Sequence, residues 1–122
     1  MLDDLFIVQQ PYSYQYLPYV PSVIVPVHDR TGGFVGFHGR SVDPGANHRY
    51  YNTGFLRERA TEILYGEDKQ DIQAAISTKK QLILAKGIID FFICYQDNHK
   101  QVVATLSKGI SVIQFDRVMR MQ

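Results

Sequence analysis

The stretch VIVPVHDRTGGFVGF, residues 23–37, decides the fold at the start of this chain. Two runs rich in β-branched and aromatic residues flank the segment from Asp29 to Gly33. Gly32 and Gly33 supply the positive φ angles that a short hairpin loop requires, so the stretch predicts a β-hairpin. Upstream, residues 1–21 contain three prolines and four tyrosines, a composition that favours an edge strand or an extended arm.

Downstream of the hairpin, residues 39–54 are predicted as loop with one short strand at 49–51, and the pattern changes to a helical period at residue 55. The ranges 55–64, 69–77 and 88–96 are typical of helices. Ser111 is placed to cap a last helix, whose apolar stripe is Val112, Phe115, Val118 and Met119. Apolar runs at 81–85 and 102–104 predict parallel strands covered on both faces.

These elements predict an α+β fold in two parts. A hairpin-rich lobe at residues 1–66 precedes a β–α–β–α half at residues 67–122. The second half leaves a sheet edge without a neighbour, and open edges tend to be paired or covered by a partner.

Composition excludes several classes of protein. The 122 residues are 45% apolar and carry a formal charge of +1, which excludes disorder and a strongly basic binder. The single cysteine excludes a disulfide framework and a multi-cysteine zinc site. His28, His38 and His48 have no fixed relative geometry, so we expect structural histidines and no metal. Without a long apolar run or a leader, we expect a cytoplasmic protein with no membrane contact.

Several segments, in order, resemble the catalytic core of bacterial DnaG-type primases. They are VPVHDRTGGFVGFHGR (residues 25–40), RYYNT (49–53), LYG (64–66), LILAKGIIDF (82–91) and VVATL (102–106). The last two are similar to the opening of a TOPRIM fold, so the resemblance implies that residues 67–122 form an incomplete TOPRIM-like half.

Departures from that pattern concern the metal site. The resemblance implies a metal-binding Glu after the first strand, where this chain has Lys86, and an Asp-x-Asp after a third strand, which does not occur before Gln122. An ammonium group cannot ligate a cation. Asp90 matches an acidic position of the family, but one carboxylate does not form a two-metal site. We therefore expect a degenerate site at Lys86 and Asp90, with no catalytic residue, metal or cofactor.

Basic and aromatic residues suggest a nucleic-acid surface. Arg40, Arg49, Arg57 and Arg59 lie in the segment that resembles the template-facing surface of the primases, and Tyr50, Tyr51 and Asn52 lie beside them in the sequence. Guanidinium groups suit phosphates and aromatic rings stack on bases. The alternative is that these are ordinary solvated arginines. Lys86 is either a phosphate clamp at a helix start or a solvent-facing residue.

The function that these patterns favour is a catalytically inactive primase-like protein of DNA replication. Its partners would be single-stranded DNA, a replication protein such as a primase or helicase, or a second copy through the open sheet edge. Two alternatives stay open: a protein-interaction decoy that mimics a primase fragment, and one half of a split primase.

Overall fold

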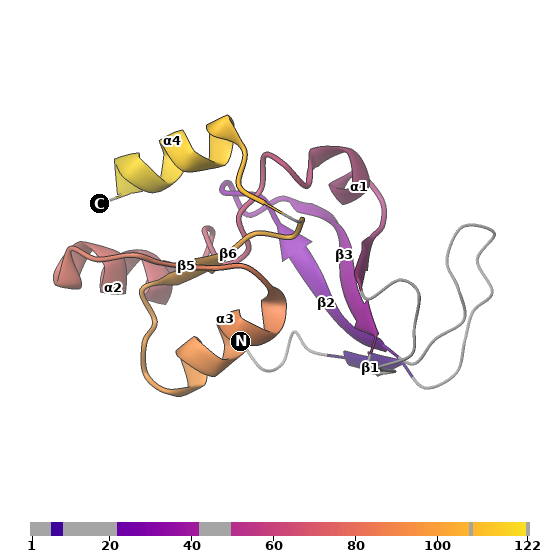
Figure 1. Ribbon diagram of the computed structural model, residues 1–122, viewed down its shortest axis with the longest axis horizontal. Helices are drawn as coiled ribbons and strands as arrows, with labels where there is room; N and C mark the ends of the chain where they lie inside the picture. Colours follow the sequence, from indigo (N-terminus) through magenta and orange to yellow (C-terminus); the bar gives the residue numbers. More distant parts are fainter. Residues whose placement is uncertain (1–5, 9–21, 42–49, 108, 122) are drawn as a thin grey trace.

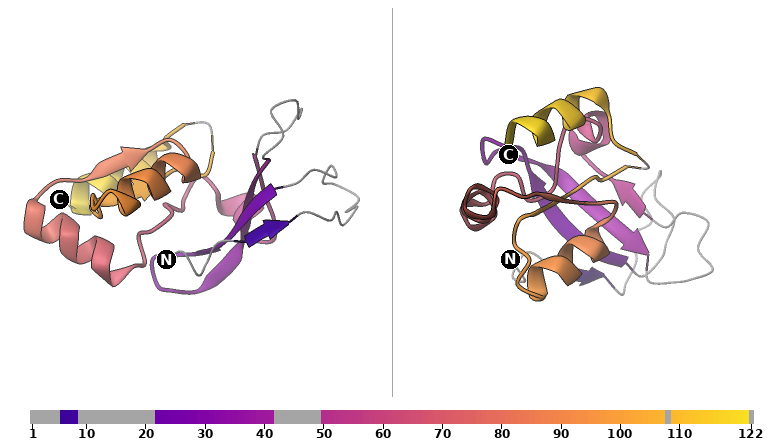
Figure 2. Two further views of the ribbon diagram at one scale, coloured as in Figure 1. Left: turned by 90° about the horizontal axis from the view of Figure 1, so that it is seen from below. Right: turned by 60° about the vertical axis from the view of Figure 1, so that its left-hand side comes forward.

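The computed structural model describes residues 6–8, 22–41, 50–107 and 109–121 (Figure 1). An antiparallel sheet forms one side of the molecule. An α/β unit with a two-stranded sheet lies beside it (Figure 2). The mixture of elements confirms the α+β class, whereas the division at residue 66 stays a prediction.

The predicted hairpin is confirmed as the centre of the antiparallel sheet. Strands β2 (Ser22–His28) and β3 (Phe34–Ser41) pair over their whole length, with a bulge between Val27 and His28. The carboxylate of Asp29 closes the turn by accepting the N–H groups of Thr31 and Gly33, both at 3.0 Å. Gly32 has φ +89°, which explains the need for glycine there.

Two short strands complete this sheet in the order β1-β2-β3-β4. Strand β1 (Phe6–Val8) pairs with β2 at the edge of the sheet, ahead of the prolines and tyrosines on which the predicted edge strand or arm depends. Those prolines and tyrosines lie outside the described residues, so the edge strand or arm stays a prediction. Strand β4 (Tyr50–Asn52) pairs with β3, so the predicted short strand forms one residue further along the chain.

The α/β unit contains a parallel pair joined by a helix. Strand β5 (Ile83–Ala85) pairs with β6 (Val102–Ala104), and α3 (Ile88–Gln96) connects them. Strand β6 is fully buried, as predicted. For β5 the prediction of two covered faces is wrong, since Leu84 in the middle of the strand is 36% exposed.

Two helical predictions require correction. The helix predicted at 55–64 ends early, since α1 covers only Leu56–Arg59. A turn at residues 60–62 follows it, and Tyr65 then exchanges two backbone hydrogen bonds with Ala104 of β6 at 2.8 and 3.1 Å. Backbone pairing with a buried strand therefore overrides the local helical period. Helix α2 (Gln70–Lys79) forms close to its predicted position.

Helix α4 (Val112–Met121) begins at the predicted cap, where the Ser111 hydroxyl accepts the N–H of Gln114 at 3.1 Å. Its predicted apolar stripe is mostly on the surface, because Val112, Phe115 and Met119 are 85%, 55% and 55% exposed. The buried residues are Gln114 and Val118. Hydrogen bonds of the Gln114 side chain attach the helix to the backbone of Ala60 and Ile63. A buried polar residue therefore holds α4 in place, and most of the predicted apolar stripe does not.

One hydrophobic core spans both parts of the chain. Val25, Val27 and Val35 of the hairpin belong to the same buried cluster as residues of α3 and β6. The cluster fixes the sheet against the α/β unit and so positions the groups between them. In the part of the chain described here, no helix is long and apolar enough to cross a membrane.

Candidate nucleic-acid interface

A small cleft of about 30 Å³ lies where the antiparallel sheet meets the α/β unit. We call it the junction cleft. His38, Arg40 and Tyr50 line it from the sheet, and the remaining lining residues follow the ends of β5 and β6: Lys86, Gly87, Ile88, Thr105, Leu106 and Ser107. Active sites of open α/β sheets also lie at the carboxyl ends of parallel strands.

Asn52 joins the two sides of the junction cleft. Its side-chain amide donates to the carbonyl oxygen of Leu106 at 3.1 Å, and its Oδ1 atom lies 2.6 Å from Nδ1 of His38. Because Oδ1 can only accept, the proton of a neutral His38 is on Nδ1. Asn52 is therefore a positioning residue that connects the sheet to the segment after β6.

His38 itself is almost fully buried, with 4% of its surface exposed. Burial lowers the pKa of His38, the positive charge of Arg40 lowers it further, and the hydrogen bond to Asn52 acts in the opposite direction. The imidazole is therefore neutral at pH 7, and it adds no positive charge to the cleft.

The positive charge of the junction cleft comes from Arg40 and Lys86. They lie 46 positions apart in the sequence (86 minus 40), and the packing of the sheet on the α/β unit brings both to one cleft. An added Cβ atom on Gly87 would lie 3.9 Å from Nη1 of Arg40, so the guanidinium reaches the first residues of α3. Within the described ranges, neither cation forms an ion pair with an acidic side chain.

The start of α3 adds to this charge. Helix α3 has nine residues, and the amide groups of its first turn have no acceptor within the helix. Such a turn carries a partial positive charge that favours an anion. The exposed Asp90 lies in the same turn and opposes it. Two full cations and the helix start outweigh one carboxylate, so the junction cleft is suited to a phosphate group.

The other predicted site residues lie away from this cleft. Tyr51 pairs with Gly39, and its ring covers that glycine so closely that an added Cβ would meet the ring at 2.4 Å. Because neighbouring side chains of a strand point to opposite faces, Tyr50 faces the cleft and Tyr51 faces the outer side of the sheet. Tyr50 pairs with Arg40 across the two strands, so the two side chains share one face of the sheet. The alternation of faces along a strand is the signal that distinguishes Tyr50 from Tyr51.

Arg57 and Arg59 are on α1. Arg59 lies 3.6 Å from the Asp29 carboxylate and 3.5 Å from that of Glu62, so acidic groups already offset its charge. Arg57 is exposed on α1 and does not line the junction cleft. Arg49 lies outside the described residues. In the part of the chain that the structure describes, no group of three or more acidic, histidine or cysteine side chains could hold a metal ion.

Comparison with known proteins finds relatives of this chain. No family model matches the chain. A DNA primase of Borreliella burgdorferi is 34% identical over 92 residues, which are 73% of this chain and 17% of that protein. A DNA primase of Synechococcus elongatus is 31% identical over 91 residues, 73% of this chain and 12% of its own length.

Solved primase structures share the fold. The Aquifex aeolicus primase, solved as its zinc-binding and RNA polymerase domains, superposes with a TM-score of 0.70 at 20% identity, over 98% of this chain and 29% of that one. A DnaG primase catalytic domain bound to single-stranded DNA gives a TM-score of 0.61 at 21% identity, over 82% and 31% of the two chains.

The chain thus spans less than a fifth of its curated relatives and about a third of the solved catalytic cores. The matches cover both the hairpin lobe and the α/β unit. Sequence similarity and fold together show that this chain is related to the DnaG-type primases and corresponds to a segment of their catalytic core.

Proposed function

We propose that this protein binds single-stranded DNA during replication as a primase-related protein that does not synthesise primers. The observation that carries the proposal is the meeting of Arg40 and Lys86 at the junction cleft, beside the start of α3. Two cations at a helix start suit a backbone phosphate, and Tyr50 at the same cleft offers a ring on which a base can stack. A DnaG catalytic domain of this fold binds single-stranded DNA, which supports the same ligand here.

The absence of primer synthesis follows from Lys86. Primases of this type are expected to hold magnesium through a Glu at that position, and an ammonium group repels the cation instead. Purified protein with magnesium, template and ribonucleotides should give no incorporation above a protein-free blank. Incorporation that disappears in the Asp90→Ala variant would contradict this part of the proposal.

Binding is tested by titrating a fluorescent single strand at several salt concentrations. Each phosphate contact on a single strand contributes about −0.7 to the slope of log affinity against log salt, so two contacts give about −1.4. The double variant Arg40→Ala/Lys86→Ala should lower the affinity and remove about 1.4 units of slope.

The matched control is Lys80→Ala/Arg120→Ala, which removes the same charge from the end of α2 and from α4. Neither residue lines the junction cleft. The control should keep most of the affinity. An equal loss in both double variants would mean that net charge, and not the cleft, attracts the DNA. No binding by the unmodified protein at low salt would refute the proposal.

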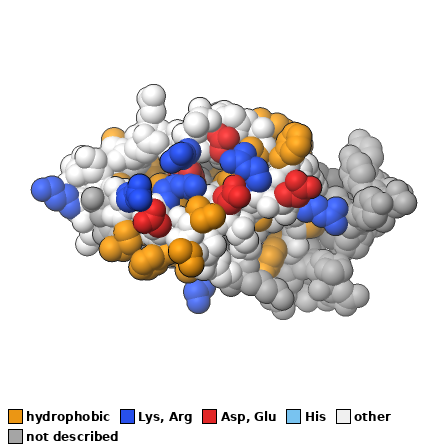
Figure 3. Space-filling view, turned by 90° about the horizontal axis from the view of Figure 1, so that it is seen from above, with side chains coloured by type: hydrophobic (Ala, Val, Ile, Leu, Met, Phe, Trp, Pro, Cys, Tyr) orange, Lys and Arg blue, Asp and Glu red, His pale blue; other side chains and the backbone are white. Residues whose placement is uncertain are grey.

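A second candidate function is docking of a protein partner, and the exposed face of α4 favours it. Besides Val112, Phe115 and Met119, Ile113 is 53% exposed, and hydrophobic side chains are visible among charged ones on the upper surface (Figure 3). Among the described residues, no strand pairs with the outer edge of β5. The partner would be a primase, a helicase or a second copy of the chain.

Sedimentation velocity tests this second candidate, with the protein alone and mixed with a purified primase or helicase. Ile113→Ser on α4 should weaken the association. Ile93→Ser on α3, which replaces an isoleucine of similar exposure (58%), should not. Association that both changes weaken equally, or a monomer that binds neither protein, would contradict docking through α4.

A further inference from the structure

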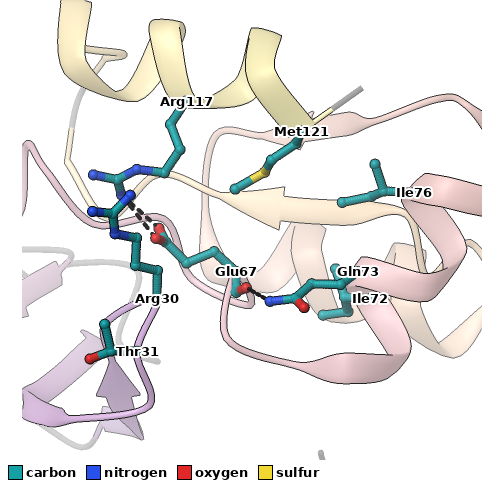
Figure 4. A pocket seen from close by; sticks show the side chains of 8 residues that line it. All are labelled: Arg30, Thr31, Glu67, Ile72, Gln73, Ile76, Arg117 and Met121. Atoms are coloured by element: carbon teal, nitrogen blue, oxygen red, sulfur yellow. Dashed lines mark hydrogen bonds and ion pairs between the residues drawn. The ribbon is translucent and has the colours of Figure 1, made fainter.

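A larger cavity, separate from the junction cleft, lies between the turn of the hairpin, α2 and α4. Its volume is about 560 Å³, within the range of pockets that bind small molecules. Figure 4 shows that its side chains come from four segments: Arg30 from the hairpin turn, Glu67 from the turn before α2, Ile72 and Ile76 from α2, and Arg117 and Met121 from α4. We call it the helix-pair cavity.

One side of the helix-pair cavity is cationic. The guanidinium groups of Arg30 and Arg117 lie on the same side, next to the carboxylate of Glu67 (Figure 4). Nη1 of Arg117 lies 2.9 Å and 3.1 Å from the two carboxylate oxygens of Glu67. The Glu67 side chain is fully buried. The one acidic group is therefore covered by its bond to Arg117, and the positive charge of Arg30 is left at the opening.

The cationic side of the helix-pair cavity has more hydrogen-bond donors than acceptors. Arg117 donates three hydrogen bonds, all from Nη1: two to Glu67 and one to the carbonyl oxygen of Glu62 at 2.5 Å. Among the described residues, no acceptor bonds its Nε or Nη2 atoms or the guanidinium of Arg30. No buried side-chain nitrogen of the described residues lacks a partner, so these remaining donors are accessible to solvent.

The opposite side of the cavity is apolar. Ile72 and Ile76 form part of the hydrophobic core, and Met121 packs against the same cluster from α4. Gln73 adds one polar group at the edge, where its side-chain amide donates to the backbone carbonyl of Glu67 at 2.6 Å. A ligand that fills this space must combine an anionic group with an apolar or planar body.

We propose that the helix-pair cavity binds a small phosphate monoester, with the phosphate on Arg30 and Arg117 and the body of the molecule against Ile76 and Met121. A phosphate has three terminal oxygens and matches two guanidinium groups, whereas a carboxylate is satisfied by one. The site goes beyond the proposed function, because none of its residues lines the junction cleft.

The test uses adenosine monophosphate as the probe and protein labelled on its methionine methyl groups. Met121 lines the helix-pair cavity, and Met119 on the same helix does not. The nucleotide should shift the Met121 methyl resonance to saturation and leave that of Met119 in place. Adenosine and inorganic phosphate, each lacking half of the ligand, should bind at least about tenfold more weakly.

Arg30→Ala should weaken the nucleotide at least about tenfold, and Arg30→Lys should restore part of the loss, because a charge-assisted bond is removed and then partly replaced. Arg30 is exposed at the hairpin turn, so neither change opens the core. The Arg40→Ala/Lys86→Ala variant should bind the nucleotide as the unmodified protein does, which separates this site from the junction cleft.

The proposal would be overturned by no shift of Met121 at millimolar nucleotide, by a shift that Arg30→Ala leaves unchanged, or by binding that is lost with Arg40 and Lys86. Inorganic phosphate that binds as tightly as the nucleotide would also overturn it, because the apolar side would then contribute nothing.

Discussion

Replacement of Gln114 by alanine should destabilise the protein strongly, although the residue is a glutamine on an amphipathic helix. Gln114 is fully buried. Its Oε1 atom accepts the N–H of Ser111 at 2.9 Å, and its Nε2 atom donates to the carbonyl oxygens of Ala60 and Ile63 at 3.1 and 2.9 Å. The side chain thereby connects α4 to the turn that follows α1.

The size of the effect follows from these three bonds. Each contributes about 1 kcal/mol net, and truncation to alanine leaves their partners buried and also opens a small cavity. We expect the free energy of unfolding to fall by about 3–4 kcal/mol, a large part of the roughly 5–15 kcal/mol typical of a domain. At about 4 °C per kcal/mol for a chain of this size, the melting temperature should fall by about 12–16 °C.

Urea denaturation followed by circular dichroism measures this change. The midpoint should fall while the slope with denaturant stays constant, because the surface exposed on unfolding is nearly the same. Gln96→Ala is the matched control, since Gln96 is exposed at the end of α3, and its effect should stay within about 0.5 kcal/mol. A loss for Gln114→Ala no larger than that of the control would refute the reasoning.

Three further predictions concern single residues. Gly36→Ala should cost about 3 kcal/mol or more in thermal unfolding, because Gly36 has φ +149° and an added Cβ would lie 2.0 Å from a backbone carbonyl oxygen; a loss below about 1 kcal/mol would contradict the clash. Burial raises the pKa of the Glu67 carboxyl group in the folded protein above its value in the unfolded chain. The stability that this difference contributes is therefore complete below the unfolded-state pKa, and it is lost as the pH rises through the folded-state pKa. The free energy of unfolding relative to Glu67→Gln should therefore fall from pH 4 towards pH 8 in urea titrations, and a rise would be inconsistent with net desolvation. Tyr50→Ala should weaken binding to single-stranded DNA by about 1–3 kcal/mol in fluorescence titrations and Tyr51→Ala should not, because only Tyr50 faces the junction cleft; the reverse order would place the bases on the outer face.

Sequence alone determined the elements whose signals are local. The hairpin depends on the side chain of Asp29 and the backbone freedom of Gly32, both within the turn itself. Helix α3 and strand β6 have the predicted bounds, because their periodicity and burial agree. The cap of α4 at Ser111 also follows from neighbouring residues. Each of these features depends on interactions over a few positions in the chain, which a sequence pattern records directly.

Tertiary structure decided the site and the exceptions to the pattern. The predicted helix does not continue after residue 59, because Tyr65 pairs through its backbone with Ala104. Helix α4 is held by the buried hydrogen bonds of Gln114 and not by most of its predicted apolar stripe. Arg40 and Lys86 meet only because the sheet packs on the α/β unit. Contacts between residues about 40 to 55 positions apart depend on how whole elements pack against one another. Periodicity, which describes one element at a time, contains no information about that packing.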